Sequence, residues 1–188
     1  MRPLLLLDVD GVLNALGRPV EDGYVLGSAD AVGRSWPICF SPGVVAHVRR
    51  WLDAGVDVQW LTTWGDEANA GLRVLLGLPA LPVAGTYDGG EEESWTAPST
   101  SLAQVTPAAP DQVTGRWWKL DVAREAVRAH PDRAVVWIDD DLDVETDAKH
   151  WMHAHGRCLL VAPNPGLGLT ASDLGGIDDF LRWSAGAI

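Results

Sequence analysis

The sequence predicts a doubly wound α/β fold, in which helices cover both faces of a mainly parallel central sheet and so form three layers. Two observations favour it. Short apolar runs of strand length alternate along the chain with segments of helical periodicity. The first of these runs, residues 4–9, opens with four leucines in a row, as expected of a strand buried on both faces. The length of 188 residues favours one domain over residues 1–188.

Four apolar runs are expected to form the sheet, at residues 4–9, 56–62, 134–138 and 158–161. A short fifth strand is expected at 81–84. Each run is four to seven residues long and is bounded by turn-forming or polar residues, which is typical of strands in an α/β sheet.

The segments between these runs carry helix signals. Ser41 followed by Pro42 is an N-cap with proline at the first helical position, and Gly55 is placed to end that helix. Thr170 and Asp173 resemble a capping box, which opens a last helix reaching to about residue 183. Further helices are expected over 66–76, 117–129 and 144–155.

Two segments lie outside this alternation. Residues 15–40 are too few for a helical cap domain, and their glycines with Tyr24-Val25-Leu26 predict a hairpin-like flap. Residues 86–114 are rich in Pro, Ser, Thr, Ala, Gly and Glu without periodicity, which predicts a long mobile loop. Without a large cap, a site at the sheet would be open to bulky substrates.

The charge balance restricts the partners. The chain has 26 acidic and 14 basic residues, a formal net charge of -12, and such a surface disfavours nucleic acid because phosphate backbones are bound chiefly by Lys and Arg. No apolar stretch is long enough for a membrane span or a signal sequence. Cys39 and Cys158 form neither a disulfide framework nor a zinc quartet. A cytoplasmic protein with free thiols is expected.

Acidic side chains follow two of the expected strands. Asp8 and Asp10 end the first, and Asp139 and Asp140 follow the run 134–138. The carboxyl ends of parallel strands meet at one edge of a sheet, where α/β folds bind ligands. Carboxylates gathered there make a hard-oxygen site suited to Mg²⁺.

Hydroxyl and cationic side chains are expected at the same edge. Thr62 and Thr63 follow the second strand, and Trp64 comes directly after them. Arg116 and Lys119 lie at the start of an expected helix, where backbone N–H groups also favour an anion. An anionic substrate could therefore bind at this edge in spite of the overall negative charge.

The ordered set of Asp-x-Asp-Gly at 8–11, Thr62 after a strand, Lys119, and Asp139-Asp140 after a strand resembles the haloacid dehalogenase superfamily. These motifs span most of the chain. The stretches around Trp60 to Trp64, Trp118-Lys119 and Trp137 to Asp141 are also similar to a group of small bacterial hydrolase-like proteins of unassigned substrate. The resemblance implies a Rossmann-like core and phosphatase chemistry.

The resemblance also implies a role for each motif residue. Asp8 would be the nucleophile that forms an aspartyl-phosphate, and Asp10 the general acid and base. Asp8, Asp139 and the backbone carbonyl of Asp10 would hold Mg²⁺, and Asp140 could be a ligand in the second metal shell. Thr62 would donate a hydrogen bond to phosphate, and Lys119 would neutralise charge on both the nucleophile and the phosphate.

Several alternatives stay open. Thr63 could replace Thr62, although strand register favours Thr62, and Arg116 could replace Lys119. Trp64 could stack on a substrate, or it could pack in the core as most tryptophans do. The three histidines of the segment 144–155 could suggest a metal cluster, but no matching cysteine or carboxylate pattern accompanies them, so a partly exposed helix face is favoured. These histidines are His150, His153 and His155.

Three functions compete. The first is a Mg²⁺-dependent phosphatase acting on a small phosphorylated metabolite such as a nucleotide or a sugar phosphate. The second is a polynucleotide-end or phosphoprotein phosphatase, which an open site permits. The third is a non-catalytic phosphate-binding or partner-binding module, which the presence of both Asp8 and Asp10 disfavours. The sequence leaves the substrate, the pathway and the oligomeric state open.

Overall fold

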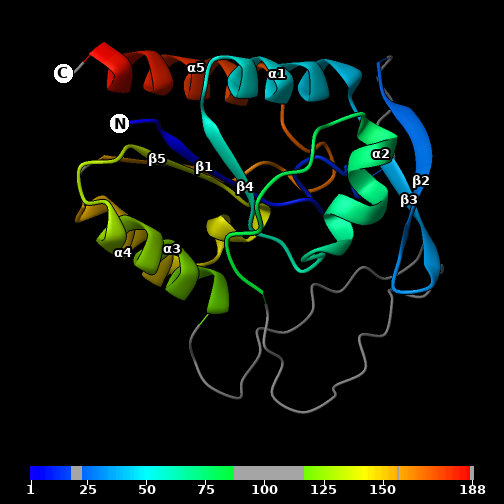
Figure 1. Ribbon diagram of the computed structural model, residues 1–188, viewed down its shortest axis with the longest axis horizontal. Helices are drawn as coiled ribbons and strands as arrows, with labels where there is room; N and C mark the ends of the chain where they lie inside the picture. Colours follow the sequence, from blue (N-terminus) through cyan, green and yellow to red (C-terminus); the bar gives the residue numbers. More distant parts are fainter. Residues whose placement is uncertain (18–22, 87–116, 156, 187–188) are drawn as a thin grey trace.

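The computed structural model describes residues 1–17, 23–86, 117–155 and 157–186 (Figure 1). Its centre is a four-stranded sheet in the order β4-β1-β5-β6. The strands are β1 (Leu4–Leu7), β4 (Asp57–Trp60), β5 (Val135–Ile138) and β6 (Cys158–Val161), and every neighbouring pair is parallel. The predicted α/β fold with a parallel central sheet is confirmed.

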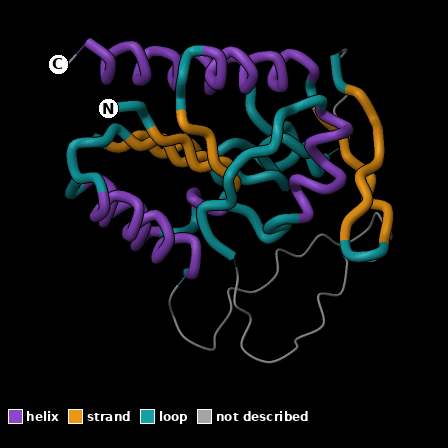
Figure 2. Tube along the Cα trace, in the orientation of Figure 1, coloured by secondary structure: helices purple, strands orange, loops and turns teal. Residues whose placement is uncertain are grey.

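Helices cover both faces of this sheet. The helices α1 (Pro42–Asp53) and α5 (Ala171–Gly186) lie on one face, and α3 (Trp118–Ala129) and α4 (Thr146–His153) lie on the other (Figures 1 and 2). Successive side chains of a strand point to opposite faces. Accordingly, Leu5 and Leu7 pack in the cluster that includes α1 and α5, while Leu4 and Leu6 pack in the cluster that includes α3 and α4. The four leucines therefore point alternately to the two helix layers.

The segment for which a flap is expected contains an antiparallel hairpin of β2 (Val25–Ala31) and β3 (Arg34–Phe40). The hairpin stands beside the sheet, next to α2 (Arg73–Leu76) (Figure 1). It is tied to the end of the first strand segment, because the backbone N–H of Ala15 donates to the carbonyl of Cys39 over 2.7 Å. The mobile loop predicted at 86–114 lies outside the described residues apart from residue 86.

The helix predicted over 66–76 differs in form from the expectation. It consists of a π-helical turn, η1 (Ala68–Leu72), that runs directly into α2. Gly71 lies against the backbone of Asp30 in the hairpin, and a Cβ atom at position 71 would overlap the Asp30 carbonyl oxygen. The close approach of β2 explains why a glycine is needed here, and local periodicity could not have revealed it.

The other differences are at element ends. The helix predicted at 144–155 is α4, preceded by a 3-10 turn, η2 (Asp140–Asp143). The strand predicted at 81–84 is reduced to a bridge between Trp60 and Val83. The capping box before α5 is confirmed, since the backbone N–H of Thr170 donates to the Asp173 carboxylate over 2.8 Å. Ser41 precedes α1 as predicted, but its hydroxyl makes no capping hydrogen bond.

Asp178 joins α5 to α1. Its carboxylate accepts a hydrogen bond from the Trp51 indole N–H over 2.7 Å and lies 3.1 Å from a ring nitrogen of His47. Partial burial raises the pKa of Asp178, but these two contacts outweigh burial and hold the pKa below its ordinary value. The ionised carboxylate therefore stabilises the packing of the two helices.

Replacing Asp178 with Ala should lower the free energy of unfolding by about 1 kcal/mol relative to Asp179→Ala, measured from urea midpoints at constant slope. Asp179 is the matched control because it lies on the same helix and pairs only at the surface, with Arg182. Because the folded pKa of Asp178 is lowered, the difference should be complete above the ordinary pKa of aspartate and should vanish as the pH falls through the lowered value. Equal midpoints for the two variants at neutral pH would contradict this account of the α1–α5 contact.

Candidate active site

The carboxyl ends of β1 and β5 bring three acidic side chains together. Asp8 directly follows β1, Asp139 directly follows β5, and Asp140 opens η2. These two strands are hydrogen-bonded neighbours with Leu7 paired to Ile138, so Asp8 and Asp139 emerge side by side. One carboxylate oxygen from each of the three acids lies within 4.8 Å of the others. The edge at which the sequence predicts a site is the edge where these acids meet.

Lys119 lies between two of these carboxylates. It is the second residue of α3, and its Nζ atom is 2.8 Å from Oδ2 of Asp8 and 2.8 Å from Oδ2 of Asp139. The side chain is buried, at 3% exposed. Burial alone would lower the pKa of Lys119, but the two carboxylates raise it above its ordinary value. Lys119 therefore carries a positive charge that two buried acids share.

One lysine does not balance the acids of the site. Burial and the charge of Asp8 raise the pKa of Asp139 well above its ordinary value, although Lys119 opposes this. Burial, followed by the charges of Asp141 and Asp8, raises the pKa of Asp140 to about 7. A further cation would relieve this repulsion.

The donor set fits Mg²⁺. The three carboxylates of Asp8, Asp139 and Asp140 are hard oxygen ligands, and they lie close enough together to share one ion. Within the described ranges they are the one such group of acidic, histidine or cysteine side chains. Asp139 is further oriented by the backbone N–H of Asp141, which donates to its Oδ1 atom over 3.2 Å.

Gly11 makes room for Asp140. Its φ of +70° lies in the left-handed region that disfavours other residues, and a Cβ atom there would overlap the carboxyl group of Asp140. Two physical features therefore require a glycine at this position of the Asp-x-Asp-Gly motif: the turn after Asp10 and the close approach of η2.

Asp10 lies beside this cluster and is held by two neutral donors. The Asn14 amide nitrogen donates to its Oδ1 atom over 2.7 Å, and the Trp64 indole N–H donates to its Oδ2 atom over 2.9 Å. Burial raises the pKa of Asp10 above its ordinary value, although both hydrogen bonds act against burial. The sequence predicted neither contact. Asn14 was not a candidate site residue, and Trp64 was a candidate only for stacking on a substrate.

The residues after β4 separate the two threonine candidates. Thr62 is buried, at 1% exposed, whereas Thr63 is exposed. The backbone N–H of Trp64 approaches Oγ1 of Thr62 at 3.4 Å. The Trp64 ring is partly buried against the core and directs its N–H to Asp10, and its stacking on a substrate stays a prediction. The role of Thr62 toward phosphate stays a prediction, and Arg116 lies outside the described residues.

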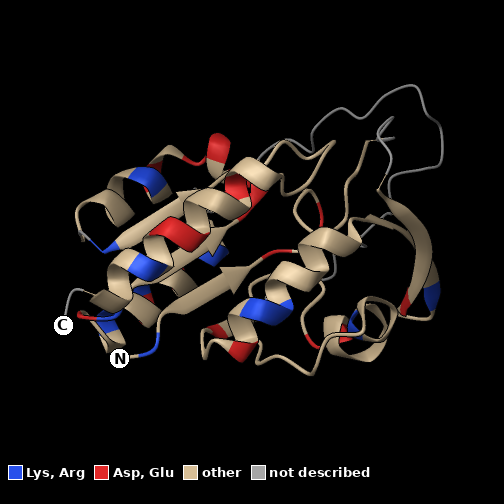
Figure 3. Cartoon of the chain, turned by 90° about the horizontal axis from the view of Figure 1, so that it is seen from above, with Lys and Arg blue, Asp and Glu red and all other residues tan. Residues whose placement is uncertain are grey.

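Acidic residues are not confined to this edge. Figure 3 shows acidic segments in the loops beyond the strand arrowheads and also on helices, where Lys and Arg lie as well. The side chains of His150, His153 and His155 are exposed, and they do not belong to the metal-competent group. A ring nitrogen of His155 contacts the Trp151 carbonyl at 2.7 Å.

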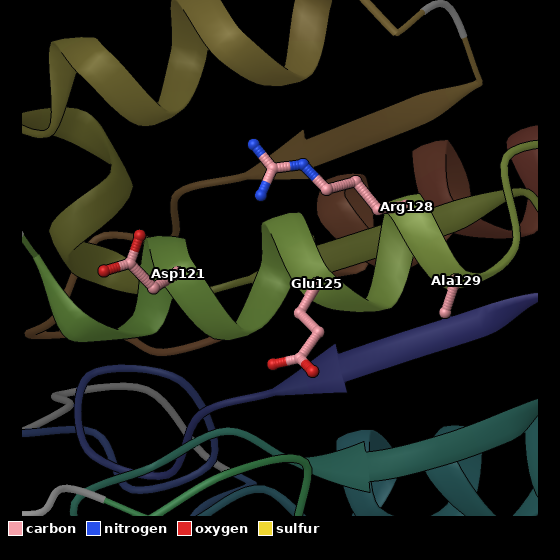
Figure 4. Close-up of a pocket in the computed structure, with 4 residues that line it drawn as sticks. All are labelled: Asp121, Glu125, Arg128 and Ala129. Atoms are coloured by element: carbon pink, nitrogen blue, oxygen red, sulfur yellow. The ribbon is translucent and has the colours of Figure 1, made fainter.

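A surface depression on α3 is not part of the site. Its volume is about 650 Å³, and its lining residues are Asp121, Glu125, Arg128 and Ala129. Figure 4 shows Asp121 and Arg128 directed to one side of the helix and Glu125 and Ala129 to the other, so the four side chains do not converge on a ligand.

None of the described helices is long and apolar enough to cross a membrane.

Replacing Lys119 with Met keeps the length of the side chain but leaves Asp8 and Asp139 without their cation. Removing one partner of a buried ion pair costs about 3–5 kcal/mol. The free energy of unfolding, measured from the urea midpoint at neutral pH with a chelator present, should therefore fall by about 3–5 kcal/mol. Lys149→Met is the control, because Lys149 pairs with Asp143 at the surface and should change stability by less than about 0.5 kcal/mol. Similar midpoints for the two variants would show that Lys119 is not the cation that balances these acids.

The comparisons with known proteins agree with this geometry. A family model described as "HAD domain in Swiss Army Knife RNA repair proteins" matches residues 4–174. Searches among curated proteins and among solved structures gave no significant match. The matched range includes the site residues from Asp8 to Asp140.

Proposed function

Since this chain belongs to the family of HAD domains found in Swiss Army Knife RNA repair proteins, we propose that it is a metal-dependent phosphatase that transfers phosphate to Asp8. The observation that carries the proposal is the position of Lys119 between the carboxylates of Asp8 and Asp139, 2.8 Å from each. A cation held between a nucleophile and a second acid suits a reaction in which negative charge is transferred.

The first step of the proposed reaction joins the phosphoryl group to the protein. A carboxylate oxygen of Asp8 attacks phosphorus, and the bond between phosphorus and the ester oxygen breaks. Asp10 gives its proton to the departing oxygen, so the alcohol leaves neutral. Lys119 lowers the repulsion between the incoming phosphate and Asp8, and Thr62 donates a hydrogen bond to a phosphate oxygen.

The second step releases the phosphate. Asp10, now ionised, takes a proton from water as the water oxygen attacks the phosphorus of the aspartyl-phosphate. The bond between phosphorus and Asp8 breaks, and the nucleophile is restored. The net change is one phosphomonoester and one water converted to one alcohol and one phosphate.

Asp8, Asp139 and Asp140 would hold the divalent ion, with the backbone carbonyl of Asp10 as a further ligand. When bound, Mg²⁺ supplies positive charge that screens the carboxylates from the phosphate and stabilises the transferring oxygens. The hard-oxygen donor set supports Mg²⁺ over softer metals.

Two substrate classes follow from different observations. The net charge of -12 makes small phosphorylated metabolites the first candidate, because an acidic surface disfavours nucleic acid. The family description favours a second, the terminal phosphate of an RNA strand. The net charge of -12 disfavours a broad nucleic-acid surface, so contact with RNA would centre on the terminal phosphate.

Phosphate release from an aryl phosphate, with and without Mg²⁺, tests the reaction. The proposal expects release that requires the metal and is lost in a chelator, and no release under any divalent ion would instead favour a non-catalytic binding module. A panel of phosphometabolites beside oligoribonucleotides with 5′- or 3′-terminal phosphates then tests the substrate class, by comparison of kcat/KM. A clear preference for the oligoribonucleotides would replace the first candidate with the second.

A further inference from the structure

Two segments far apart in the sequence converge on the carboxyl group of Asp10. Asn14 contacts Oδ1 from the turn after β1, and Trp64 contacts Oδ2 from the turn after β4. Both oxygens of one acid are thus held by N–H donors at 2.7 and 2.9 Å.

The Asn14 side chain can face Asp10 in one orientation only. It is buried, at 6% exposed, and its Oδ1 atom accepts a hydrogen bond from the backbone N–H of Cys39 over 2.9 Å. A backbone N–H can only donate, so the amide oxygen has to face Cys39 and the amide nitrogen has to face Asp10. The same side chain therefore ties the end of β3 in the hairpin to Asp10.

The Trp64 contact is directional for a similar reason. An indole N–H is a donor only, and here it points to a carboxylate. The Trp64 backbone N–H lies 3.4 Å from Oγ1 of Thr62. One short turn after β4 therefore carries both the threonine proposed to bind phosphate and the donor that holds Asp10.

We propose that Asn14 and Trp64 are positioning residues, which fix the carboxyl group of Asp10 in the direction required for proton transfer to the leaving oxygen and from water. This inference rests on the function proposed above. Proton transfer requires the two heavy atoms to lie within about 2.6–3.2 Å, and a misplacement of about 1 Å can cost roughly 100-fold in rate. A carboxylate has about four lone-pair positions, so two N–H donors orient the group and leave positions free for the proton.

The donors are neutral, and this suits the role. A lysine or an arginine at either position would form a further ion pair in a site where Lys119 already pairs with Asp8 and Asp139. An amide and an indole orient Asp10 without adding a positive charge that would compete with Lys119 for the phosphate.

The central experiment compares Trp64→Phe with the wild type on an alkyl phosphate and an aryl phosphate. The aryl group departs without protonation. The value of kcat/KM, which reports transfer of phosphate to Asp8, should therefore fall about 10- to 100-fold on the alkyl phosphate and markedly less on the aryl phosphate. With the aryl phosphate, phosphorylated Asp8 should accumulate in Trp64→Phe, because the attack of water still needs Asp10 as base. The ratio of the two activities does not depend on how much of the preparation is folded.

Trp36→Phe is the matched control. The Trp36 indole donates to the Ala31 carbonyl over 3.2 Å within the hairpin, so this change also removes an indole hydrogen bond, but not one to Asp10. The ratio of activities should stay at the wild-type value. Asn14→Leu, which removes the other donor to Asp10, should shift the ratio in the same direction as Trp64→Phe.

A double variant isolates the route through Asp10. If Trp64 acts by positioning Asp10, Trp64→Phe should cause no further change in the ratio once Asp10→Asn is present. A change of equal size in both backgrounds, or the same ratio in Trp64→Phe as in Trp36→Phe, would overturn the inference. The proposed function would fail by a different result, namely wild-type turnover in Asp8→Asn.

Discussion

Asp8→Asn should abolish turnover of every phosphomonoester that the wild type hydrolyses. Asparagine keeps the shape of the side chain but lacks the attacking carboxylate, so no phospho-enzyme can form. The measurement is phosphate release under saturating substrate and Mg²⁺, with kcat falling below detection. Affinity for Mg²⁺ should also fall, because Asp8 belongs to the group of carboxylates that would hold the ion.

Asp143→Asn serves as the control for Asp8→Asn. Asp143 is a nearby acid at the end of η2, its side chain is 85% exposed, and its partner is the surface residue Lys149. Removing its charge should leave kcat within about twofold of the wild type, since surface charges act weakly across water. Equal losses in both variants would mean that general electrostatics, rather than nucleophilic attack by Asp8, controls the rate.

Asp10→Asn should lower kcat by roughly 10²–10⁴-fold, the usual contribution of general acid–base catalysis. The loss of kcat/KM, which reports transfer of phosphate to Asp8, should be large for an alkyl phosphate and smaller for an aryl phosphate, because only the alkyl leaving group needs a proton. Mg²⁺ affinity should fall less than in Asp8→Asn, since the proposed metal ligand at position 10 is a backbone carbonyl. A loss of kcat/KM that is the same for both leaving groups would exclude Asp10 as the general acid.

Much of the fold could be predicted because its signals are local. The four leucines of β1 divide between the two layers as a buried parallel strand requires, and the Thr170–Asp173 box opens α5 where it was expected. The acids Asp8 and Asp139 were expected at one sheet edge, since each ends a strand, and the parallel pairing of β1 and β5 puts them there. The π-helical turn η1 was not predicted, because it accompanies the tertiary approach of the hairpin at Gly71.

The contacts of Asp10 were not predicted from the sequence. Asn14 lies four residues from Asp10, so its contact could have been suspected from the turn after Gly11. Trp64 lies 54 residues from Asp10, and no pattern in the sequence indicates which way its indole points. Lys119 was assigned from its place in an ordered set of motifs, and its equal distances to two carboxylates could only come from the structure.

Acid trapping of the intermediate shows whether Asp8 becomes phosphorylated. Wild type and Asp10→Asn would be mixed with an aryl phosphate and Mg²⁺, quenched in acid and digested for mass spectrometry. We expect one phosphoryl group on the peptide that contains Asp8, at a higher level in Asp10→Asn because release by water is slowed. The adduct should be absent from Asp8→Asn. Turnover without any phosphorylated peptide in Asp10→Asn, or a phosphoryl group on another residue, would rule out Asp8 as the nucleophile.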